Sequence, residues 1–358
     1  MMVDISLPLV TFIIPVYNTE NYVGRAIDSV LAQTYANIEI ILVNDGSTDN
    51  SLTICESYVR RNNAIKLINQ TNSGVSAARN AAMQVSKGKY IQFMDSDDEI
   101  NNDMTETFMK LMSGNDYDTV ICGYSTIGRS NNNVVGETRC YRGKEILFLA
   151  YLDKGLLSLI SSSANMIFKK NIIEEHNLKF NSEFAIGEDG LFSLDYLSKS
   201  KQVYVINESL YNYHTYEPNE RVSAVSHFIP DVYELRIAYF KKLYLEIEDS
   251  LDDEQKNEIL QVFHDRLISG LVRLGAYFEL YSKKDIQNRI GLVLNDSFVV
   301  MSSKVYRRRR ESDSWVIPLL IKMKSKKILI RILEQKGELY IRIYGKQSII
   351  GSVFKKKI

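Results

Sequence analysis

The sequence predicts an α/β fold in which helices flank a mostly parallel sheet, followed by a helical, basic C-terminal region. Over about the first 100 residues, short apolar runs rich in β-branched and aromatic residues alternate with segments whose apolar residues recur at helical spacing. Polar turns close those runs, and such alternation implies right-handed crossovers between parallel strands. The charge is also segregated, because 16 Lys and Arg but only 4 Asp and Glu lie between Lys304 and the end.

The first 100 residues contain the clearest elements. LVTFIIPVYN is a continuous apolar run, which predicts a strand buried on both faces and ended by Pro15. Asp49 and Ser51 are both good N-cap residues for the helix that follows the second strand. The predicted strands are residues 9–18, 38–45, 64–70 and 90–98, and the predicted helices are residues 21–35, 52–61 and 73–85.

After residue 100 the pattern loosens, and each element rests on a shorter stretch of sequence. The expected elements are a strand at 117–125, a loop or hairpin at 130–143, mainly helices over 144–178, a turn and helix at 183–200, a pair of strands at 202–214 and helices over 232–294.

Composition places the chain among ordinary globular proteins. Hydrophobic residues make up 45% and charged residues 25% of the 358 residues, which suits one large domain with an appendage. The three Cys residues are too few and too scattered for a disulfide framework or a zinc site, which favours a reduced, cytoplasmic setting. Asp4 and the lack of a basic segment at the N-terminus predict no signal peptide, and no apolar run approaches the roughly 18 residues that span a bilayer.

An acidic group directly follows the fourth predicted strand. In YIQFMDSDDE, residues 90–99, the apolar run stops at Asp95, and Asp97, Asp98 and Glu99 follow without a Lys or Arg beside them. Ligands of open parallel sheets bind outside the carboxyl ends of the strands, so this group is expected to face a crevice. Crowded carboxylates raise one another's pKa unless a cation joins them, which indicates Mg²⁺ or Mn²⁺ holding a diphosphate. The alternative is a solvated acidic turn or helix start.

Two segments resemble family 2 glycosyltransferases of the GT-A fold, with four motifs in the family's order and spacing. They are VTFIIPVYNTENYVGRAIDSVLAQTYANIEIILVNDGSTDNS and NSGVSAARNAAMQVSKGKYIQFMDSDD. The likeness is dense over about residues 8–100 and looser to about residue 225. It implies a GT-A domain at 1–225, with a nucleotide-binding half (8–100) and an acceptor half (101–225), then a helical extension at 226–303 and a basic amphipathic region at 304–358.

The resemblance implies a site for a nucleotide sugar. Asp45 in VNDGS matches the aspartate that accepts a hydrogen bond from N3–H of uracil, and otherwise it is a turn residue. Arg79 matches a position that faces the nucleotide, with a surface salt bridge as the alternative, and Asp95 is expected near the ribose. The other implied contacts are Pro15, Tyr17 and Asn18 in the loop that packs on the nucleoside, Gly74 at a close backbone approach, Ser96 in the DxD-type motif, and Glu188.

The resemblance also implies metal ligands and a catalytic base. Asp97 is expected at the metal and diphosphate with Asp98 as a second ligand, and the sequence leaves open which of the two coordinates. His214 in YNYH matches a position near the metal or diphosphate, with a structural histidine as the alternative. GEDGLF supplies Glu188 and Asp189, and Asp189 matches the base that deprotonates the acceptor hydroxyl in transfer with inversion. A helix N-terminal acidic pair is the alternative there.

The basic region at 304–358 mixes Arg and Lys with apolar residues. Such segments lie on anionic membrane surfaces, which would suit a lipid-linked acceptor. The alternative is a helix that packs on the rest of the chain or on a second subunit. Nucleic-acid binding is not expected, because no recognised module accompanies the charge. One apolar face is predicted from Trp315, Ile317, Leu320, Ile321, Ile328, Leu329 and Ile332.

The sequence therefore predicts an inverting, metal-dependent glycosyltransferase. We expect it to move a hexose-type sugar from a UDP-linked donor to a hydroxyl of a glycan or lipid-linked glycan, with Mn²⁺ or Mg²⁺ as cofactor. The expected setting is bacterial cell-surface polysaccharide synthesis at the inner face of the cell membrane. Two rivals are a catalytically silent nucleotide-sugar-binding scaffold and a sugar nucleotidyltransferase, whose glycine-rich N-terminal signature is missing. The donor sugar, the acceptor, the linkage and a homo-oligomeric state are left open.

Overall fold

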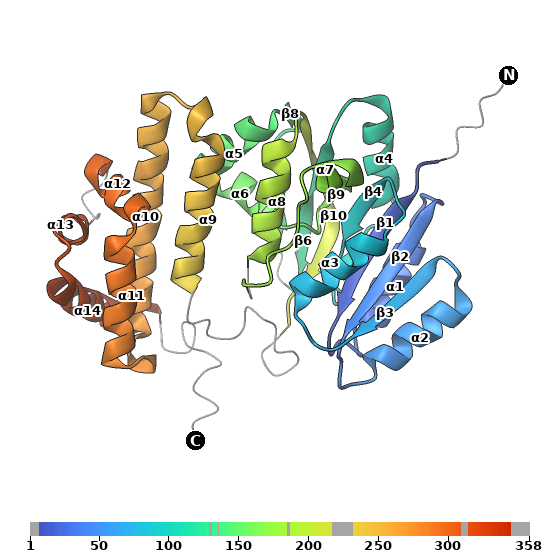
Figure 1. Cartoon of the computed structure of the whole chain (residues 1–358), viewed down its shortest axis with the longest axis horizontal. Helices are drawn as coiled ribbons and strands as arrows, with labels where there is room; N and C mark the ends of the chain where they lie inside the picture. Colours follow the sequence, from blue (N-terminus) through green and yellow to red (C-terminus); the bar gives the residue numbers. More distant parts are fainter. Residues whose placement is uncertain are drawn as a thin grey trace. The chain divides into compact units, whose positions relative to one another are not determined.

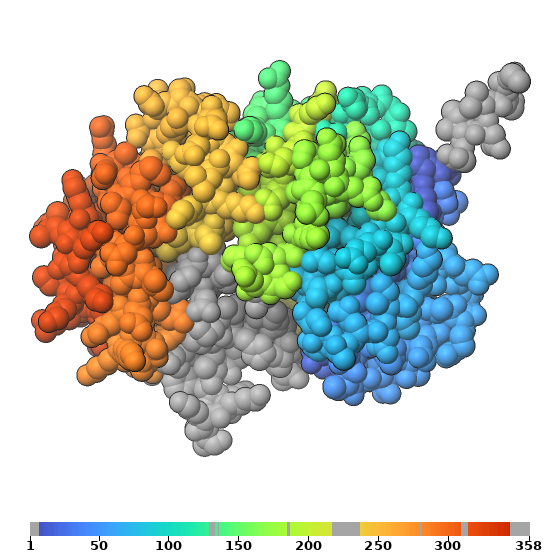
Figure 2. Space-filling view, viewed as in Figure 1, coloured from blue at the N-terminus to red at the C-terminus, as the bar shows by residue number. Residues whose placement is uncertain are grey.

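The computed structural model describes residues 7–128, 131–134, 136–184, 187–216, 232–308 and 314–344. The chain divides into two compact units, residues 1–217 and 218–358, whose colours can be followed in Figure 1 and Figure 2. The predicted boundary at 225–226 lies outside the described residues.

The N-terminal unit is built on one ten-stranded sheet (Figure 1). Its strands are β1 (Val10–Val16), β2 (Ile38–Asp45), β3 (Ile65–Gln70), β4 (Tyr90–Phe93), β5 (Glu99–Ile100), β6 (Thr119–Ile127), β7 (Asn131–Asn133), β8 (Arg139–Tyr141), β9 (Met166–Lys169) and β10 (Val203–His214). Their order is β3-β2-β1-β4-β9-β6-β10-β5, with β7 paired to β6 and β8 paired to β10. β1 to β4 run parallel, β6 and β10 are parallel to each other, and β9 is antiparallel to both of its neighbours.

Helices flank this sheet, and α1, α2 and α3 connect its first four strands. The helices of the unit are α1 (Val23–Leu31), α2 (Ser51–Arg61), α3 (Val75–Val85), α4 (Met104–Gly114), α5 (Gly143–Leu152), α6 (Lys154–Ile160), α7 (Lys170–Glu175) and α8 (Glu188–Lys199). The predicted fold class, a mostly parallel α/β sheet flanked by helices, is confirmed.

One prediction for the later strands is wrong and one is incomplete. The stretch 144–178 is mainly helical, as predicted, but it also contains the strand β9, which pairs with β4 and β6. Its four residues are too few for periodicity to separate a strand from a helical turn. The expected pair of strands at 202–214 is the single strand β10. Its pairing with β6 shifts register between Val205 and Ser209, so the polar Asn207 and Glu208 mark an irregularity within a strand rather than a turn between two.

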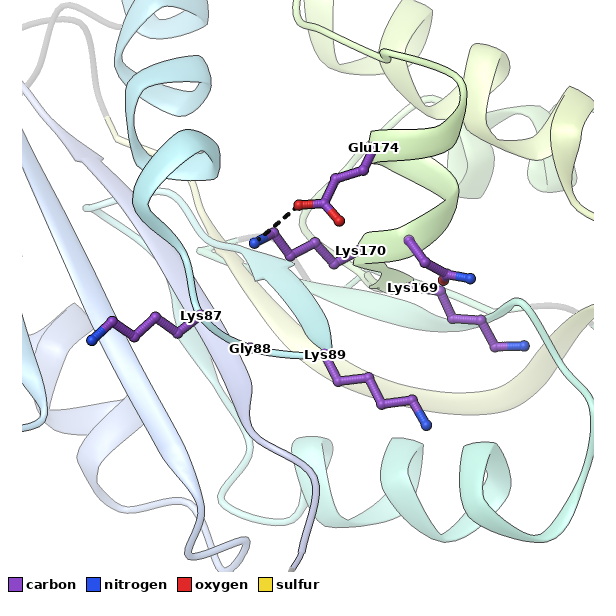
Figure 3. Close-up of a pocket in the computed structure, with 7 residues that line it drawn as sticks. Lys87, Gly88, Lys89, Lys169, Lys170 and Glu174 are labelled. Carbon is purple, nitrogen blue, oxygen red and sulfur yellow. Dashed lines mark ion pairs between the residues drawn. The ribbon is translucent and has the colours of Figure 1, made fainter.

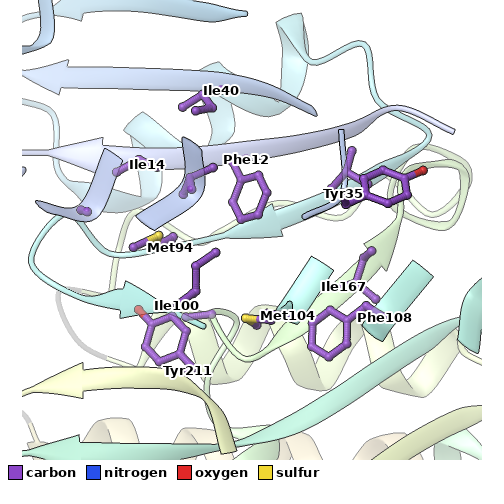
Figure 4. Close-up of a cluster of buried hydrophobic side chains, with 14 of the residues drawn as sticks. Phe12, Ile14, Tyr35, Ile40, Met94, Ile100, Met104, Phe108, Ile167 and Tyr211 are labelled. Atoms are coloured by element: carbon purple, nitrogen blue, oxygen red, sulfur yellow. The ribbon is translucent and has the colours of Figure 1, made fainter. Parts of the chain in front are cut away.

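The core on one face of the sheet explains the apolar run of β1. Side chains alternate along a strand, so Phe12 and Ile14 point to the same face. On that face they belong to one buried cluster with Ile40 of β2 and with Met104 and Phe108 of α4, as Figure 4 shows. Burial on both sides is the reason that the strand carries no polar alternation.

An aromatic cluster packs around the end of β4. The ring centroid of Phe93 lies 5.0 Å from that of Phe180 and 5.5 Å from that of Phe192, and both contacts are edge-to-face. Phe180 and Phe192 stack on each other with centroids 4.1 Å apart. The guanidinium of Arg79 lies 5.1 Å from the Phe180 ring, so this packing reaches the charged residues described below.

The C-terminal unit is helical in its described residues. Its helices are α9 (Val232–Ile247), α10 (Asp253–Ala276), α11 (Lys283–Asn295), α12 (Ser297–Val305), α13 (Val316–Lys322) and α14 (Lys326–Tyr344), with short 3₁₀ turns at Glu248–Ser250 and Phe278–Leu280. The predicted helical region is thus confirmed. None of the described helices is both long enough and apolar enough to cross a bilayer.

The apolar face predicted for the basic region at 304–358 is divided between two helices in the structure. The chain breaks between α13 and α14 near Lys324, whose φ is 51°, so the predicted positions do not lie along one helix. Most of the apolar residues pack inside the unit, whereas Trp315 and Ile328 are exposed. The predicted residues that are buried are Ile317, Leu320, Ile321 and Leu329, and Ile332 is half-buried.

Candidate functional site

Residues distant in sequence meet at the carboxyl ends of β1, β2 and β4. Because these strands are parallel neighbours with β1 in the middle, their carboxyl ends lie at one edge of the sheet. Tyr17 and Asn18 follow β1, Asp45 ends β2, and Asp95 and Asp97 follow β4. The topology therefore gathers most of the predicted donor-site residues at this edge.

Asp45 holds the segment that leads into α3. Its buried carboxylate accepts hydrogen bonds from Gln70 Nε2 at 2.8 Å, from the Ser73 N–H at 2.8 Å and from the Gly74 N–H at 2.9 Å. Gly74 has a φ of 87°, and a Cβ there would meet nothing within 4 Å, so the backbone conformation favours glycine rather than any lack of space. A carboxylate has about four lone-pair positions, which leaves one for a ligand.

Asn18 ties the loop after β1 to the loop after β2. Its Oδ1 accepts from the Thr48 N–H at 2.8 Å, and its own N–H donates to Ser47 Oγ at 3.1 Å. Tyr17 beside it is 47% exposed and presents its ring at the surface. Pro15 is buried within β1, so it does not reach the surface as the nucleoside contact that the resemblance implied.

Arg79 joins two carboxylates from distant segments. Its guanidinium, only 5% exposed, lies 2.9 Å from Asp95 Oδ1 and 2.8 Å from Glu188 Oε1. Burial opposes the charge, but the neighbouring carboxylates raise the pKa of Arg79 above its usual value. Arg79 and Glu188 are thus held by each other inside the protein. They are therefore more buried than Asp95 and are directed to each other. The resemblance had implied that both would contact the nucleotide directly.

Asp189 lies in the first turn of α8, directly after Gly187, whose φ of 80° is in the left-handed region. Its half-buried carboxylate accepts from the Gly190 N–H at 2.8 Å. Burial and then the charge of Glu188 raise the pKa of Asp189 to about 7, while Arg79 opposes the shift. A carboxylate with a pKa near the working pH is suited to act as a general base.

The predicted metal set Asp97, Asp98 and His214 does not form. The Asp98 carboxylate is buried and accepts from Tyr211 Oη at 2.6 Å and from the His214 backbone N–H at 2.8 Å. The His214 ring is directed to Glu99, with Nε2 2.7 Å from Oε2. Burial raises the pKa of Asp98 to about 8. Over the described ranges, no three His, Cys, Asp or Glu side chains are grouped so as to hold a metal ion.

Ser96 is another predicted contact that points inward. It is buried, and its Oγ accepts from Thr19 Oγ1 at 3.2 Å, so it joins two loops within the protein. Its side chain supports the segment that carries Asp95 and Asp97.

Arg25 and Tyr216 are site residues that the sequence did not predict. Arg25 donates from a terminal nitrogen to the carbonyl oxygen of Asp97 at 2.9 Å, and its Nε lies 3.1 Å from Glu99 Oε2. Tyr216 Oη donates to the same carbonyl at 2.8 Å. No local motif marks either residue. The one available signal is that Arg25 is in the first turn of α1, which begins at the carboxyl edge of β1.

Comparison with known proteins identifies the family. Residues 11–176 match the family model described as glycosyl transferase family 2. Glycosyltransferase GlyG of Streptococcus pneumoniae is 34% identical over 214 residues, which cover 57% of this chain and 70% of GlyG. The chain belongs to glycosyl transferase family 2.

One further relative and one solved structure are also similar to this chain. The uncharacterized glycosyltransferase EpsJ of Bacillus subtilis is 29% identical over 303 residues, which cover 82% of this chain and 85% of EpsJ. The structure of S. aureus TarS 1–349 in complex with UDP-GlcNAc matches with a TM-score of 0.71 over 93% of this chain and 92% of that chain, at 20% identity. That likeness confirms the GT-A fold, and the family membership makes the chain a transferase.

The resemblance to family 2 glycosyltransferases implies a divalent cation, and two residues at the edge fit one. Asp95 is 41% exposed and Asp97 is half-buried, and both offer carboxylate oxygens. Mg²⁺ characteristically takes one or two carboxylates and completes its shell with phosphate oxygens and water, so a preformed three-ligand cage is not required. Asp98 and His214 are directed elsewhere, because the Asp98 carboxylate is buried against Tyr211 and the His214 ring faces Glu99.

The pocket in Figure 3 is separate from the carboxyl edge of β1, β2 and β4. Its volume is about 500 Å³, and Lys89 on its wall directly precedes β4, at the amino end of that strand. Lys169 is paired with Asp118 at 2.9 Å and Lys170 with Glu174 at 3.2 Å, so much of its positive charge is already balanced. The lining residues are Lys87, Gly88, Lys89, Lys169, Lys170, Asn171 and Glu174.

Proposed function

We propose that this family 2 glycosyltransferase is an inverting, metal-dependent hexosyltransferase. Its donor is a UDP-linked sugar, and its acceptor is a hydroxyl of a glycan or lipid-linked glycan. One observation carries the proposal: Arg79 bridges Asp95 and Glu188 at 2.9 and 2.8 Å. This bridge ties the residue expected at the donor to the helical turn that carries Asp189.

The uracil base is suited to Asp45. The remaining lone pair of the Asp45 carboxylate can accept the N3–H of uracil, a donor that cytosine and adenine lack. The exposed ring of Tyr17 offers a flat surface beside this position. S. aureus TarS, which shares the fold, forms complexes with UDP and UDP-GlcNAc.

Asp189 is the base in the proposed reaction. Its carboxylate takes the proton of the acceptor hydroxyl as that oxygen forms a bond to C1 of the sugar. The bond from C1 to the diphosphate oxygen breaks on the opposite side, and its electron pair leaves with UDP. The configuration at C1 therefore inverts without a covalent enzyme intermediate. A pKa of about 7 allows Asp189 to be ionised before transfer and protonated after it.

The protein fixes the carboxylates that would hold a divalent cation. When bound at Asp95 and Asp97, the cation would stabilise the charge that grows on the leaving diphosphate. Arg79 orients the Asp95 carboxylate, and Arg25 and Tyr216 both bond to the backbone carbonyl of Asp97. These contacts reduce the motion of the acidic segment before the donor arrives.

The setting that we propose is bacterial cell-surface polysaccharide synthesis on the inner side of the cell membrane. The support for it is the basic character of the C-terminal region, with 16 Lys and Arg after residue 303. A lipid-linked acceptor would be presented at that surface.

A screen of nucleotide sugars tests the function. The purified protein is incubated with UDP-, GDP- and CMP-linked sugars, and release of the nucleotide is measured with Mn²⁺ or Mg²⁺ and with EDTA. We expect release from one or a few UDP-sugars, reduced at least about 100-fold by EDTA, since the cation stabilises the leaving group. A silent scaffold would bind a UDP-sugar without releasing UDP under any of these conditions.

A pair of matched aspartate variants sharpens this screen. Asp97→Asn is expected to lose the response to metal, whereas Asp103→Asn, an exposed aspartate at the start of α4, should keep the wild-type rate. Equal activity of wild type and Asp97→Asn in metal and in EDTA would remove the metal from the mechanism.

A further inference from the structure

An exposed apolar ridge runs along α13. Trp315, Leu319 and Met323 follow one another at intervals of four residues, which places them on one face of the helix, and they are 63%, 44% and 66% exposed. The opposite side of α13 is the packed one, with Ile317 and Ile321 fully buried. The ridge is therefore not the side of α13 that packs into the core of the unit.

The next helix, α14, repeats this division. Leu329 and Leu333 are fully buried, whereas Ile328, Leu339 and Ile343 are 52%, 56% and 65% exposed. At 100° per residue the three exposed side chains fall within about 60° of one another. Figure 2 shows α13 and α14, the red end of the colour bar, at the surface of the helical unit. The two adjoining helices together expose six large apolar side chains. Ordinary protein surfaces expose such side chains singly and scattered, so this number needs an explanation.

The charge around these residues is strongly one-sided. Between residues 304 and 344, the described part of the chain has ten Lys and Arg side chains and two acidic ones, Glu334 and Glu338, all of them exposed. Two copies of the chain meeting through this face would bring like charges together. An anionic surface would instead be complementary to it, so the charge distinguishes between the two occupants.

We propose that the apolar ridge of α13 and the exposed stripe of α14 bind the surface of an anionic lipid bilayer. The apolar side chains enter the boundary between headgroups and acyl chains, with Trp315 at the interface, where indole rings concentrate. The exposed Lys322, Lys324 and Lys327, which are close to the ridge in sequence, meet the lipid phosphates. This binding is separate from the transfer reaction, so it holds or fails whether or not Asp189 is the base.

The single tryptophan of the chain provides a direct measurement. Trp315 is the only Trp, so the intrinsic emission reports on the ridge itself. Full-length protein is titrated with vesicles of phosphatidylcholine alone and with vesicles containing about a third phosphatidylglycerol. We expect the emission to move to shorter wavelength with the anionic vesicles, at least about 10-fold less binding to neutral vesicles, and weaker binding as salt is raised. An unchanged emission with anionic vesicles would overturn the proposal.

Exposed substitutions separate the two contributions without touching the buried faces. Leu319→Ser with Met323→Ser should weaken partitioning by roughly 10-fold or more, because less apolar surface enters the bilayer. Lys322→Gln with Lys327→Gln should weaken it by roughly 10- to 30-fold on anionic vesicles, since each basic residue contributes about a factor of five. Val85→Ser, an exposed apolar residue of α3, is the matched control and should bind as wild type.

Sedimentation velocity without lipid decides between the bilayer and a second copy. We expect the protein to stay monomeric at concentrations where it binds vesicles. A dimer that the Leu319→Ser, Met323→Ser variant dissociates would assign the face to self-association and overturn the proposal. Vesicle binding that both double variants leave unchanged would also overturn it.

Discussion

Arg79 is the residue on which the charges of the site depend most directly. It is buried between Asp95 and Glu188, so its removal would leave two carboxylates without their common partner. Breaking a buried ion pair from one side is much more costly than losing an exposed one.

Arg79→Ala is therefore expected to lower the free energy of unfolding of the N-terminal unit by about 3–5 kcal/mol, measured by urea denaturation with circular dichroism. The matched control is Arg60→Ala, which breaks an exposed pair with Glu56 and should change the free energy by about 0.5 kcal/mol or less. Equal effects of the two variants would contradict the buried role of Arg79.

Asp189 determines the expected pH dependence of transfer. Its raised pKa of about 7 means that a falling pH protonates it in the neutral range rather than near pH 4. Because the base must be ionised to accept a proton, kcat/KM should rise about 10-fold per pH unit below pH 7 and level off above it. Initial rates of UDP release between pH 5 and 9 measure this. A profile that stays flat down to pH 5 would show that no group of this pKa controls the reaction.

The site could be predicted from sequence where its residues lie in short motifs. Asp95 and Asp97 stand together in FMDSDD, which the charge pattern indicated, and Glu188 stands with Asp189 in GEDGLF, which the resemblance to family 2 glycosyltransferases implied. The contact between the groups runs through Arg79 and depends on how three separate segments pack. The hydrogen bond from Tyr211 to the buried Asp98 carboxylate also depends on packing between distant segments, so the local sequence could not predict it.

At the scale of elements, the parallel half of the sheet was predictable and the centre was not. β1, β2 and β4 are buried along almost their whole length because helices cover both faces, and their predominantly apolar composition is visible in the chain. β9 has four residues between helices, so its place between β4 and β6 follows from long-range pairing. β10 contains a register shift that resembles a turn in sequence.

Helices α10 and α14 pack closely because of two glycines. A Cβ built on Gly337 would collide with the backbone of Gly275, and one on Gly275 would collide with the backbone of Leu333. Backbone cannot move aside as a flexible side chain does. Gly337→Ala is thus expected to destabilise the helical unit by about 1–3 kcal/mol, measured by urea unfolding with circular dichroism as the probe.

A second glycine in the same unit is the control for this prediction. Gly291 in α11 has only the flexible Lys326 side chain near its added Cβ, at 3.4 Å. Gly291→Ala should therefore stabilise the unit by about 0.5–1 kcal/mol through helix propensity. If both substitutions stabilise the unit, the helices are not packed at the glycines as described.

At the scale of the whole molecule, the formal net charge of zero is the sum of a positive and a negative part of the chain. Residues 304–358 carry a formal charge of +12, and residues 1–303 therefore carry −12. A protein with its charges mixed evenly would bind weakly to either kind of ion exchanger at its isoelectric point. Segregated charge lets each part bind independently, because fields beyond a Debye length of about 8–10 Å are screened.

The chain is accordingly expected to bind both cation and anion exchangers at pH 7 and low salt. Lys322→Gln with Lys327→Gln should elute earlier from the cation exchanger and unchanged from the anion exchanger. Failure of the wild type to bind the cation exchanger would show that the basic side chains do not form an accessible surface.

The fold class and the division of charge were thus predictable over the whole chain, since both are summed over many residues. The tail illustrates the limit of that reasoning. Its apolar residues were assigned to one face, but the break near Lys324 splits them between two helices, and packing on α10 and α12 decides which are buried. Composition shows that apolar surface exists, whereas tertiary contacts decide how much remains exposed.

The central claim is that Asp189 removes the proton of the acceptor hydroxyl, whereas other residues, Asp45 and Asp95 among them, bind the UDP-sugar donor. Its most direct test compares UDP binding and sugar transfer in Asp189→Asn, with the donor that the nucleotide-sugar screen identifies. We predict a loss of kcat of at least about 1,000-fold with a UDP dissociation constant within about threefold of wild type, because the amide keeps the shape and loses only the base. Transfer at a rate near wild type by Asp189→Asn would contradict the claim.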